Sequence, residues 1–178
     1  NLALYKVAWA YYRASRYPQA IEHFSMLIEW SDAEMLRTGR AGTELRAEAV
    51  QYLGITFAYD DWNENQVPDP AEGGPRGIQR IQEPTLLRQD AAWTSEVYFQ
   101  LGQVYFDEAR YDLAIEVWEL ALSRWPMHPR APEIVNLIAR SHQRLQNLEE
   151  ALAAQSRFVN YSQGTEWWQN NLDHPIEQ

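Results

Sequence analysis

The apolar residues of this chain recur with the period of an α-helix along most of its length. In 111–125 they stand at i, i+3, i+4 and i+7, in a stripe formed by Ala114, Ile115, Val117, Trp118, Ala121, Leu122 and Trp125. A stripe of this width predicts a helix that packs against neighbours on two sides. The same period predicts helices over 132–145 and over roughly 43–60. The pattern therefore predicts an all-α fold.

Prolines mark where two of these helices meet. Pro126, Pro129 and Pro132 separate the stripe of 111–125 from the next periodic segment. Because proline cannot continue a helix interior but is tolerated in a first turn, we expect one helix to end before Pro126 and the next to begin near Pro132.

A short apolar phrase is repeated along the chain. Residues 17–24 (YPQAIEHF) match 111–118 (YDLAIEVW), and 148–152 (LEEAL) repeat the start of the phrase. Each phrase follows a helical segment that ends in a polar turn. Ala114 and Ala151 lie 37 positions apart, a spacing typical of repeated helix pairs.

The segment 95–126 resembles the tetratricopeptide repeat family. Small and aromatic residues stand at the family's spacing, at Tyr98, Leu101, Gly102, Tyr105, Ala114, Trp118, Ala121 and Pro126. The first repeat keeps much of this pattern, at Leu4, Val7, Ala8, Tyr11, Ala20, Phe24 and Leu27, but has Asp32 in place of the closing proline. The resemblance implies an α-α superhelix of about four helix pairs, one of them degenerate.

We expect one domain over 1–178, divided into repeats and an insertion. The predicted parts are repeat 1 at 1–34, a degenerate repeat 2 at 43–90 with an insertion at 62–90, repeat 3 at 95–128, repeat 4 at 132–164, and a further helix or tail at 165–178. The insertion is dense in turn formers, so we expect an exposed loop, followed by a short helix from Pro75 to Gln82 that buries Ile78 and Ile81.

Composition narrows the classes of partner. The formal charge of −10 disfavours nucleic acid and anionic membranes as partners. Cysteine is absent, which excludes disulfides and thiolate metal sites. No apolar run approaches the roughly 20 residues that span a bilayer. The chain opens inside a predicted helix without an initiating Met, so we expect it to be part of a longer protein.

No constellation of residues predicts catalysis or a cofactor. His23, His128, His142 and His174 are widely spaced, and neither a nucleophile elbow nor a phosphate loop is present. We therefore expect no enzyme activity. From Asp61 to Glu72, oxygen donors follow part of a calcium-loop spacing, but Gln66 stands where that loop needs glycine. An acidic surface loop is the favoured interpretation, with calcium as the alternative.

The resemblance also implies a binding surface, because the first helices of such pairs line a concave groove. By that analogy the partner-binding residues are Tyr5, Trp9, Tyr12, Arg13, Gln51, Ile55, Tyr59, Phe99, Gln103, Phe106, Asn136, Arg140, Gln143 and Arg144. Aromatic side chains that end in a basic region favour a protein or peptide partner with bulky side chains and an acidic end. Two alternatives stay open: aromatic stacking on a cell-wall glycan, and an insertion that folds over the groove.

A finer resemblance concerns the compartment. Residues 114–134 are similar to the longer repeats of bacterial outer-membrane assembly lipoproteins and motility-associated proteins. This implies a scaffold within a larger multiprotein assembly in the periplasm or cell envelope of a Gram-negative bacterium, with the cytoplasm as the alternative.

Overall fold

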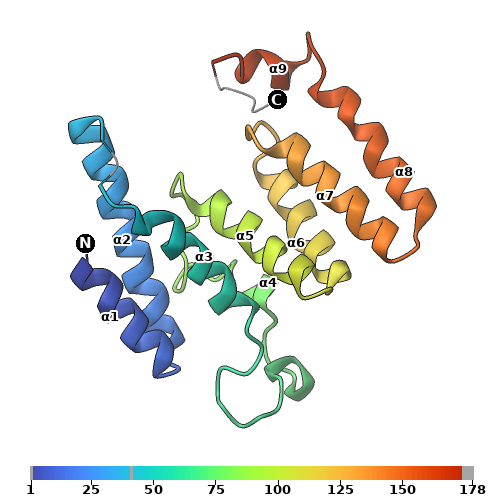
Figure 1. Cartoon of the computed structure of the whole chain (residues 1–178). Coiled ribbons are helices and arrows are strands. Elements are labelled where there is room, and N and C mark those ends of the chain that lie inside the picture. The colour runs from blue at the N-terminus through green and yellow to red at the C-terminus, as the bar shows by residue number, and fades with distance from the viewer. Residues whose placement is uncertain (1, 41, 174–178) are drawn as a thin grey trace. The chain divides into compact units, whose positions relative to one another are not determined.

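A computed structural model describes residues 2–40 and 42–173, and their regular secondary structure is entirely helical (Figure 1). The elements are α1 (Leu2–Arg13), α2 (Tyr17–Thr38), α3 (Leu45–Ala58), the 3-10 helix η1 (Asp69–Glu72), α4 (Gly77–Arg80), α5 (Thr94–Asp107), α6 (Tyr111–Arg124), α7 (Ala131–Arg144), α8 (Leu148–Ser156), η2 (Arg157–Tyr161) and α9 (Glu166–Asn170). They form two compact units, Asn1–Val104 and Tyr105–Gln178, which divide within α5. Each unit is described by itself.

Helices that follow each other in sequence pack together within each unit. In the first unit α2 lies against both α1 and α3, and in the second α7 lies against both α6 and α8 (Figure 1). Helix α2 thus contacts both its partner in the first pair and the first helix of the next pair. The predicted all-α fold of helix–turn–helix pairs is confirmed.

The three turns inside the pairs have the same geometry. Their equivalent residues Ser15, Ala109 and Gln146 adopt positive φ angles of 54°, 59° and 62°. One residue later a backbone N–H donates across the turn, from Arg16 to Tyr11 O, from Arg110 to Tyr105 O, and from Asn147 to His142 O, at 2.8–2.9 Å. This hydrogen bond, to the carbonyl oxygen five residues earlier, gives a partner to a carbonyl group that has no N–H partner within the helix. The conformation recurs although none of the three residues is glycine.

Helix α2 continues past the end predicted for repeat 1. Asp32 stands where the family pattern has proline, so nothing interrupts the backbone hydrogen bonds there. The helix ends only at Gly39, which has φ 69° and donates its N–H to Met35 O at 2.8 Å. The last turns of α2 expose Leu36 almost completely.

The second helix of repeat 2 is replaced by the insertion, as predicted. Residues 63–68 are exposed, and α4 is the short predicted helix, with Ile78 and Ile81 buried. The insertion is nevertheless not only a surface loop, because Leu87 is buried as well, as are Ala91 and Trp93 directly after the insertion. The segment between α4 and α5 thus contributes apolar side chains to the core.

A buried ion pair organises the first half of the insertion. Arg80 pairs with Asp69, donates to Tyr59 O at 2.9 Å and places its Cζ atom 4.4 Å from the ring centroid of Trp62. Asp69 also accepts from the Trp62 backbone N–H at 3.1 Å and from Asn63 Nδ2 at 3.0 Å. Sequence analysis predicts an exposed loop around Asp69, and for this residue the expectation is wrong; it makes no prediction for the burial of Arg80.

Two contacts join α3 to the start of α5. A Cβ atom added at Gly54 would lie 2.6 Å from Gln100 Cγ, so the two helices approach as closely as glycine allows. Arg46 donates to Asp32 of α2 at 2.5 Å and to Glu96 of α5 at 2.8 Å. Both carboxylates raise the pKa of Arg46, and Glu96 contributes the larger effect.

The second unit has its core between α6 and α7. The core contains Val117, Trp118, Ala121, Ile134, Val135 and Ile138, all fully buried. Helix α9 covers the loop between α6 and α7, where Trp167 Nε1 donates to His128 O at 2.9 Å. The predicted further helix is thus present at 166–170, while 174–178 lie outside the described residues.

Candidate functional site

The residues predicted to bind a partner lie on α1, α3, α5 and α7, or directly beyond α3. They are divided between the two units, and each group is described within its own unit. No described helix combines the length and apolarity that a membrane span requires. Within 2–40 and 42–173, no three His, Asp or Glu side chains gather in an arrangement that could hold a metal ion.

The donors of the calcium-like segment bond to the protein instead. Asp61 accepts the backbone N–H groups of Asn65 and Gln66 at 3.2 and 2.9 Å. Asp69 pairs with Arg80, and Glu72 accepts from Asn65 Nδ2 at 2.7 Å. These hydrogen bonds and the ion pair engage the carboxylates of Asp61, Asp69 and Glu72 with groups of the loop itself and with Arg80.

An aromatic cluster lies between α1 and α3 in the first unit. We define it by Tyr5, Trp9, Tyr12 and Tyr52, all half-buried. The ring centroids of Trp9 and Tyr52 are 4.6 Å apart, and Tyr52 stacks on the buried Phe24 at 5.6 Å. Trp9 Nε1 donates to Tyr5 Oη at 2.6 Å, and Tyr5 donates to Glu48 Oε1 at 2.5 Å.

Sequence analysis predicts three members of the aromatic cluster and misses Tyr52. This residue adjoins Gln51 and is three positions before Ile55, both predicted for the groove, so helical spacing alone could have found it. Its ring lies between Trp9 and Phe24, and it is therefore the centre of the cluster.

Burial raises the pKa of Tyr5, Tyr12, Tyr52 and Tyr59 above the ordinary tyrosine value. The hydrogen bond from Tyr5 to Glu48 raises the pKa of Tyr5 further, and the Glu48 charge raises that of Tyr52. The raised pKa values extend the pH range in which these hydroxyl groups stay protonated and can donate hydrogen bonds.

The rim of the aromatic cluster is more accessible. Arg13, Gln51 and Tyr59 are exposed, whereas Ile55 is half-buried. The insertion reaches one end of this surface, where Trp62 lies 5.3 Å from the ring of Tyr17. The insertion therefore covers the Tyr17 end of the first unit and leaves Gln51 in solvent.

The expectation of an exposed aromatic at Phe99 is wrong. Its side chain is only 2% exposed, so it belongs to the core and cannot present a ring to a partner. The insertion encloses this end of α5: the Tyr98 hydroxyl donates to Gln89 Oε1 at 3.0 Å. Gln103, one turn further along α5, is half-buried.

The second unit presents a polar strip along α7. We define the α7 strip by Asn136, Arg140, Gln143 and Arg144, all exposed and spaced along one helix face. Arg140 Cζ lies 5.4 Å from the ring centroid of the half-buried Phe106. Neither arginine forms a salt bridge with another residue in the described part of the chain. The structure thus brings all five predicted residues of this unit together.

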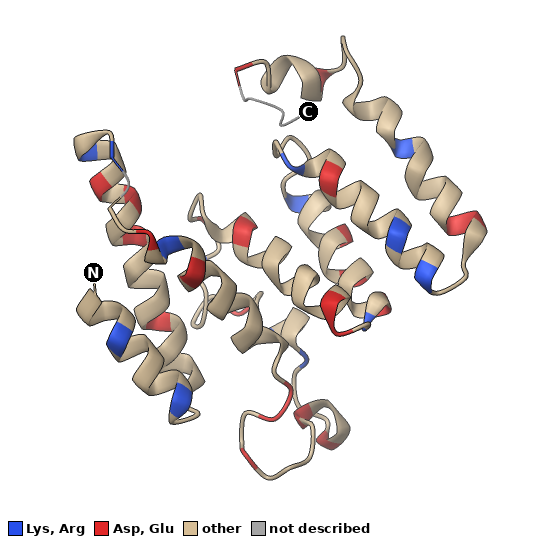
Figure 2. Ribbon diagram, in the orientation of Figure 1, with Lys and Arg blue, Asp and Glu red and all other residues tan. Residues whose placement is uncertain are grey.

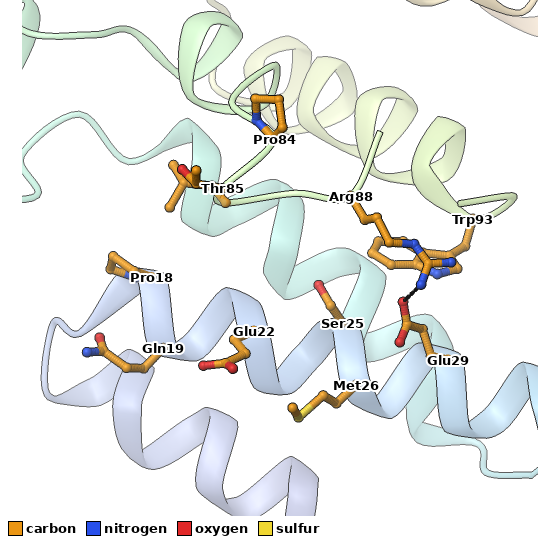
Figure 3. Close-up of a pocket in the computed structure, with 11 residues that line it drawn as sticks. Pro18, Gln19, Glu22, Ser25, Met26, Glu29, Pro84, Thr85, Arg88 and Trp93 are labelled. Carbon is orange, nitrogen blue, oxygen red and sulfur yellow. Dashed lines mark ion pairs between the residues drawn. The ribbon is translucent and has the colours of Figure 1, made fainter. Parts of the chain in front are cut away.

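A cleft in the first unit was not predicted (Figure 3). It has a volume of about 540 Å³ and lies between α2 and residues 84–93, which are the end of the insertion and the residues that follow it. Arg88 crosses it to pair with Glu29 at 2.9 Å. The Trp93 indole nitrogen beside it is shielded from solvent and has no hydrogen-bond partner. Because the insertion forms one wall, helical periodicity carries no signal of this cleft.

Comparison with known protein families assigns the repeats. Residues 2–29 and residues 99–165 each match the tetratricopeptide repeat. The first match covers α1 and the first part of α2, and the second runs from within α5 to the residue before α9. Tetratricopeptide repeats thus make up these two segments of the chain, and such repeats generally mediate protein–protein interactions. A comparison with curated proteins found no match.

Proposed function

We propose that this chain is a non-enzymatic scaffold that binds a peptide or protein segment along the first helices of its pairs. The observation that supports this most is the α7 strip. A protein of formal charge −10 keeps Arg140 and Arg144 exposed, one helical turn apart and without an acidic partner among the described residues. Two guanidinium groups placed in this way favour an acidic ligand.

The strip offers complementary chemistry around these charges. Guanidinium groups bind carboxylates through paired hydrogen bonds. The Asn136 side chain, one turn before Arg140, has both a donor and an acceptor for a peptide main chain. The Phe106 ring below Arg140 adds an apolar contact. The ligand we propose for this unit is therefore a segment with an acidic group beside an apolar side chain.

In the first unit the aromatic cluster is the proposed contact surface. Its half-buried rings and the exposed Tyr59 suit bulky apolar side chains, while Gln51 suits a peptide main chain. Glycan binding is less favoured by this geometry. The rings of Tyr5 and Trp9 meet at 68° and those of Trp9 and Tyr12 at 80°. Edge-to-face packing of this kind leaves no flat platform for a sugar.

The setting of this function is proposed on resemblance alone. The similarity of 114–134 to longer bacterial envelope and motility repeats supports a role within a multiprotein assembly in the periplasm or envelope of a Gram-negative bacterium. Detection of the native protein in a periplasmic rather than a cytoplasmic cell fraction tests this setting.

The α7 strip can be tested with a peptide display library of random 12-residue sequences. We expect the parent chain to enrich peptides that combine Asp or Glu with an aromatic residue. The variant Arg140→Glu/Arg144→Glu should lose this enrichment at unchanged helicity, because both side chains are exposed. Arg37→Glu/Arg40→Glu makes the same change of net charge at two exposed positions, one in the last turn of α2 and one just beyond it; this is the matched control and should bind as the parent does.

Two results would overturn the proposal for this surface. One is enrichment of the same peptides by the α7 variant, which would place the binding site elsewhere. The other is equal loss in the α7 variant and in the Arg37/Arg40 control, which would indicate that net charge alone and no particular surface holds the peptides.

A further inference from the structure

The cleft between α2 and residues 84–93 lies on a second helix, whereas the residues proposed above to bind a partner lie on first helices or directly beyond one. The whole cleft belongs to the first unit. Its volume of about 540 Å³ falls within the range of ligand sites, about 300–1,000 Å³. It extends along α2 from Pro18 to Glu29 (Figure 3). A short segment of another chain can therefore lie in it along α2.

The α2 wall of this cleft is acidic. Helix α2 contains four acidic residues and one basic residue, Arg37 (Figure 2). Two of the acidic residues, Glu22 and Glu29, line the cleft. Glu22 is exposed and forms no salt bridge with another residue in 2–40 and 42–173. The two glutamates are two helical turns apart, which is about 10 Å along the axis. Carboxylates in this arrangement favour a ligand with two positive charges.

The chain itself already places one cation in the cleft. Arg88 reaches Glu29 from the opposite wall, with Nη1 2.9 Å from Oε1, and both side chains are largely exposed. Exposed ion pairs of this kind are weak. The Nε atom of Arg88 also lies 3.3 Å from Oδ1 of the exposed Asp90, so Asp90 can retain Arg88 when it leaves Glu29. The Arg88 pair thus shows that the cleft accommodates a guanidinium group, and it leaves Glu29 open to exchange.

A buried hydrogen-bond donor lies at the same end of the cleft. Trp93 is 4% exposed and lines the cleft near the pair of Arg88 and Glu29 (Figure 3). Its indole nitrogen is shielded from solvent and has no acceptor. Folded proteins seldom leave a buried donor unpaired, because the lost hydrogen bonds to water are then not replaced. An acceptor supplied by a ligand, such as a main-chain carbonyl group, would complete this site.

We propose that the cleft binds an extended basic segment of another protein. In this complex two Lys or Arg side chains pair with Glu22 and Glu29, and a main-chain carbonyl group accepts from Trp93 Nε1. Polyproline II geometry suits both requirements. Its carbonyl groups have no internal hydrogen bonds, and side chains three residues apart lie on one side, about 9 Å from each other. This separation is close to that of the two glutamates along α2. The ligand has the opposite charge to the segment proposed for the α7 strip, so the two sites are independent.

Fluorescence anisotropy with two labelled peptides tests the charge and the spacing. The peptide GPRPPRPG has its arginines three positions apart, and GPRRPPPG has the same composition with adjacent arginines. In about 0.15 M salt, where long-range attraction is screened, we expect the first peptide to bind about two- to fivefold more tightly. This factor is the contribution of one exposed ion pair.

Paired variants assign the carboxylates. Glu22→Gln/Glu29→Gln should abolish binding of GPRPPRPG, because both partners of the arginines are lost. Glu149→Gln/Glu150→Gln makes the same change of net charge at two exposed positions of α8 and should bind as the parent does. All four positions lie outside the fully buried core, so circular dichroism should show unchanged helicity.

The internal cation gives a second and opposite effect. Arg88→Met removes the side chain that competes for Glu29, so it should strengthen binding about two- to fivefold. Arg37→Met is the matched control, because it removes an exposed arginine from a pair with Glu34 on the same helix. This control should leave the affinity unchanged.

The Trp93 indole group reports directly on the site. The chain has eight tryptophans, and the indole N–H resonance of Trp93 can be identified in nitrogen–proton NMR spectra by its loss in Trp93→Phe. Addition of GPRPPRPG should shift this resonance downfield, as a new hydrogen bond does. Trp93→Phe should also weaken binding about three- to tenfold, the contribution of one hydrogen bond.

Four results would overturn the proposal. Absence of binding by the parent would exclude a basic ligand for this cleft. Equal affinity for the two peptides, or equal loss in the Glu149/Glu150 control, would attribute binding to net charge alone. An unchanged affinity in Arg88→Met would show that the ligand does not use Glu29. An unshifted Trp93 resonance would place the peptide on another surface. The variant Arg140→Glu/Arg144→Glu should bind GPRPPRPG at least as tightly as the parent, which keeps this proposal distinguishable from that for the α7 strip.

Discussion

The ion pair of Arg80 and Asp69 allows a quantitative test of how the insertion is held. We consider Arg80→Met, which keeps most of the side-chain volume and removes the charge. Arg80 is 4% exposed, and the change removes its bonds to Asp69 and Tyr59 O and its contact with Trp62. Loss of one partner from a buried pair costs about 3–5 kcal/mol, because the other charge is left buried.

The donors that still bond to Asp69 in Arg80→Met reduce the expected loss of unfolding free energy. Asp69 keeps the Trp62 N–H at 3.1 Å and Asn63 Nδ2 at 3.0 Å, so its carboxylate is not stripped of partners. We therefore expect the lower end of the range, about 3 kcal/mol of unfolding free energy. The double variant Arg80→Met/Asp69→Leu leaves no unpaired buried charge but also removes the acceptor of the Trp62 N–H and of Asn63 Nδ2, so it should recover part of the loss and be more stable than Arg80→Met.

Urea unfolding monitored by tryptophan fluorescence measures these values. Limited proteolysis at 63–68 reports locally on the insertion and should be faster in Arg80→Met. Arg88→Met is the matched control, because Arg88 is 60% exposed in its pair with Glu29. An exposed pair contributes about 0–1 kcal/mol. Equal stability of Arg80→Met and Arg88→Met would refute the role assigned to the buried pair.

Three further perturbations test the packing, the turns and the tyrosines. Gly54→Ala should lower the unfolding free energy by about 1–3 kcal/mol, because the new Cβ atom would meet Gln100; a parent-like urea midpoint would contradict the close approach. Ala109→Gly should raise the free energy of unfolding by about 0.5 kcal/mol, and the melting temperature with it, because glycine adopts a positive φ without strain. A lower melting temperature would show that alanine is not strained at this position. The raised pKa of Tyr52 means that the folded state holds its proton longer than the unfolded state does. Stability should thus be constant below the unfolded value of about 10 and fall as pH rises through the folded pKa, a fall that Tyr52→Phe should reduce in alkaline denaturation followed by circular dichroism.

The helices and their pairing could be predicted because they depend on local pattern. The stripe of 111–125 and the spacing from Tyr98 to Pro126 each involve residues within a few turns of one another. The extension of α2 also has a local cause, the absence of proline at position 32. The resemblance to the repeat family predicts the four residues of the α7 strip, and helical spacing places them on one face of that helix.

The insertion could not be predicted in this way, because its order depends on contacts between distant residues. Arg80 and Asp69 are ordinary surface residues by type, and only folding brings them together in the interior. The burial of Phe99 has the same origin, because the returning insertion encloses the start of α5. The left-handed conformation of Ala109 was likewise not predictable from residue type, since alanine gives no turn signal.

The position of Arg46 between two carboxylates has a consequence for the order of events in folding. Its partner on α2 is 14 residues away in sequence, whereas its partner on α5 is 50 residues away. Helix pairs close short loops and form quickly, but Glu96 can reach Arg46 only after the intervening chain has returned. We therefore expect the bond to Glu96 to form after the rate-limiting barrier. Its removal in Glu96→Gln should speed unfolding and leave the refolding rate nearly unchanged. The two ion pairs of the Arg46 guanidinium would then form at different stages of folding, the pair with Asp32 early and the pair with Glu96 late.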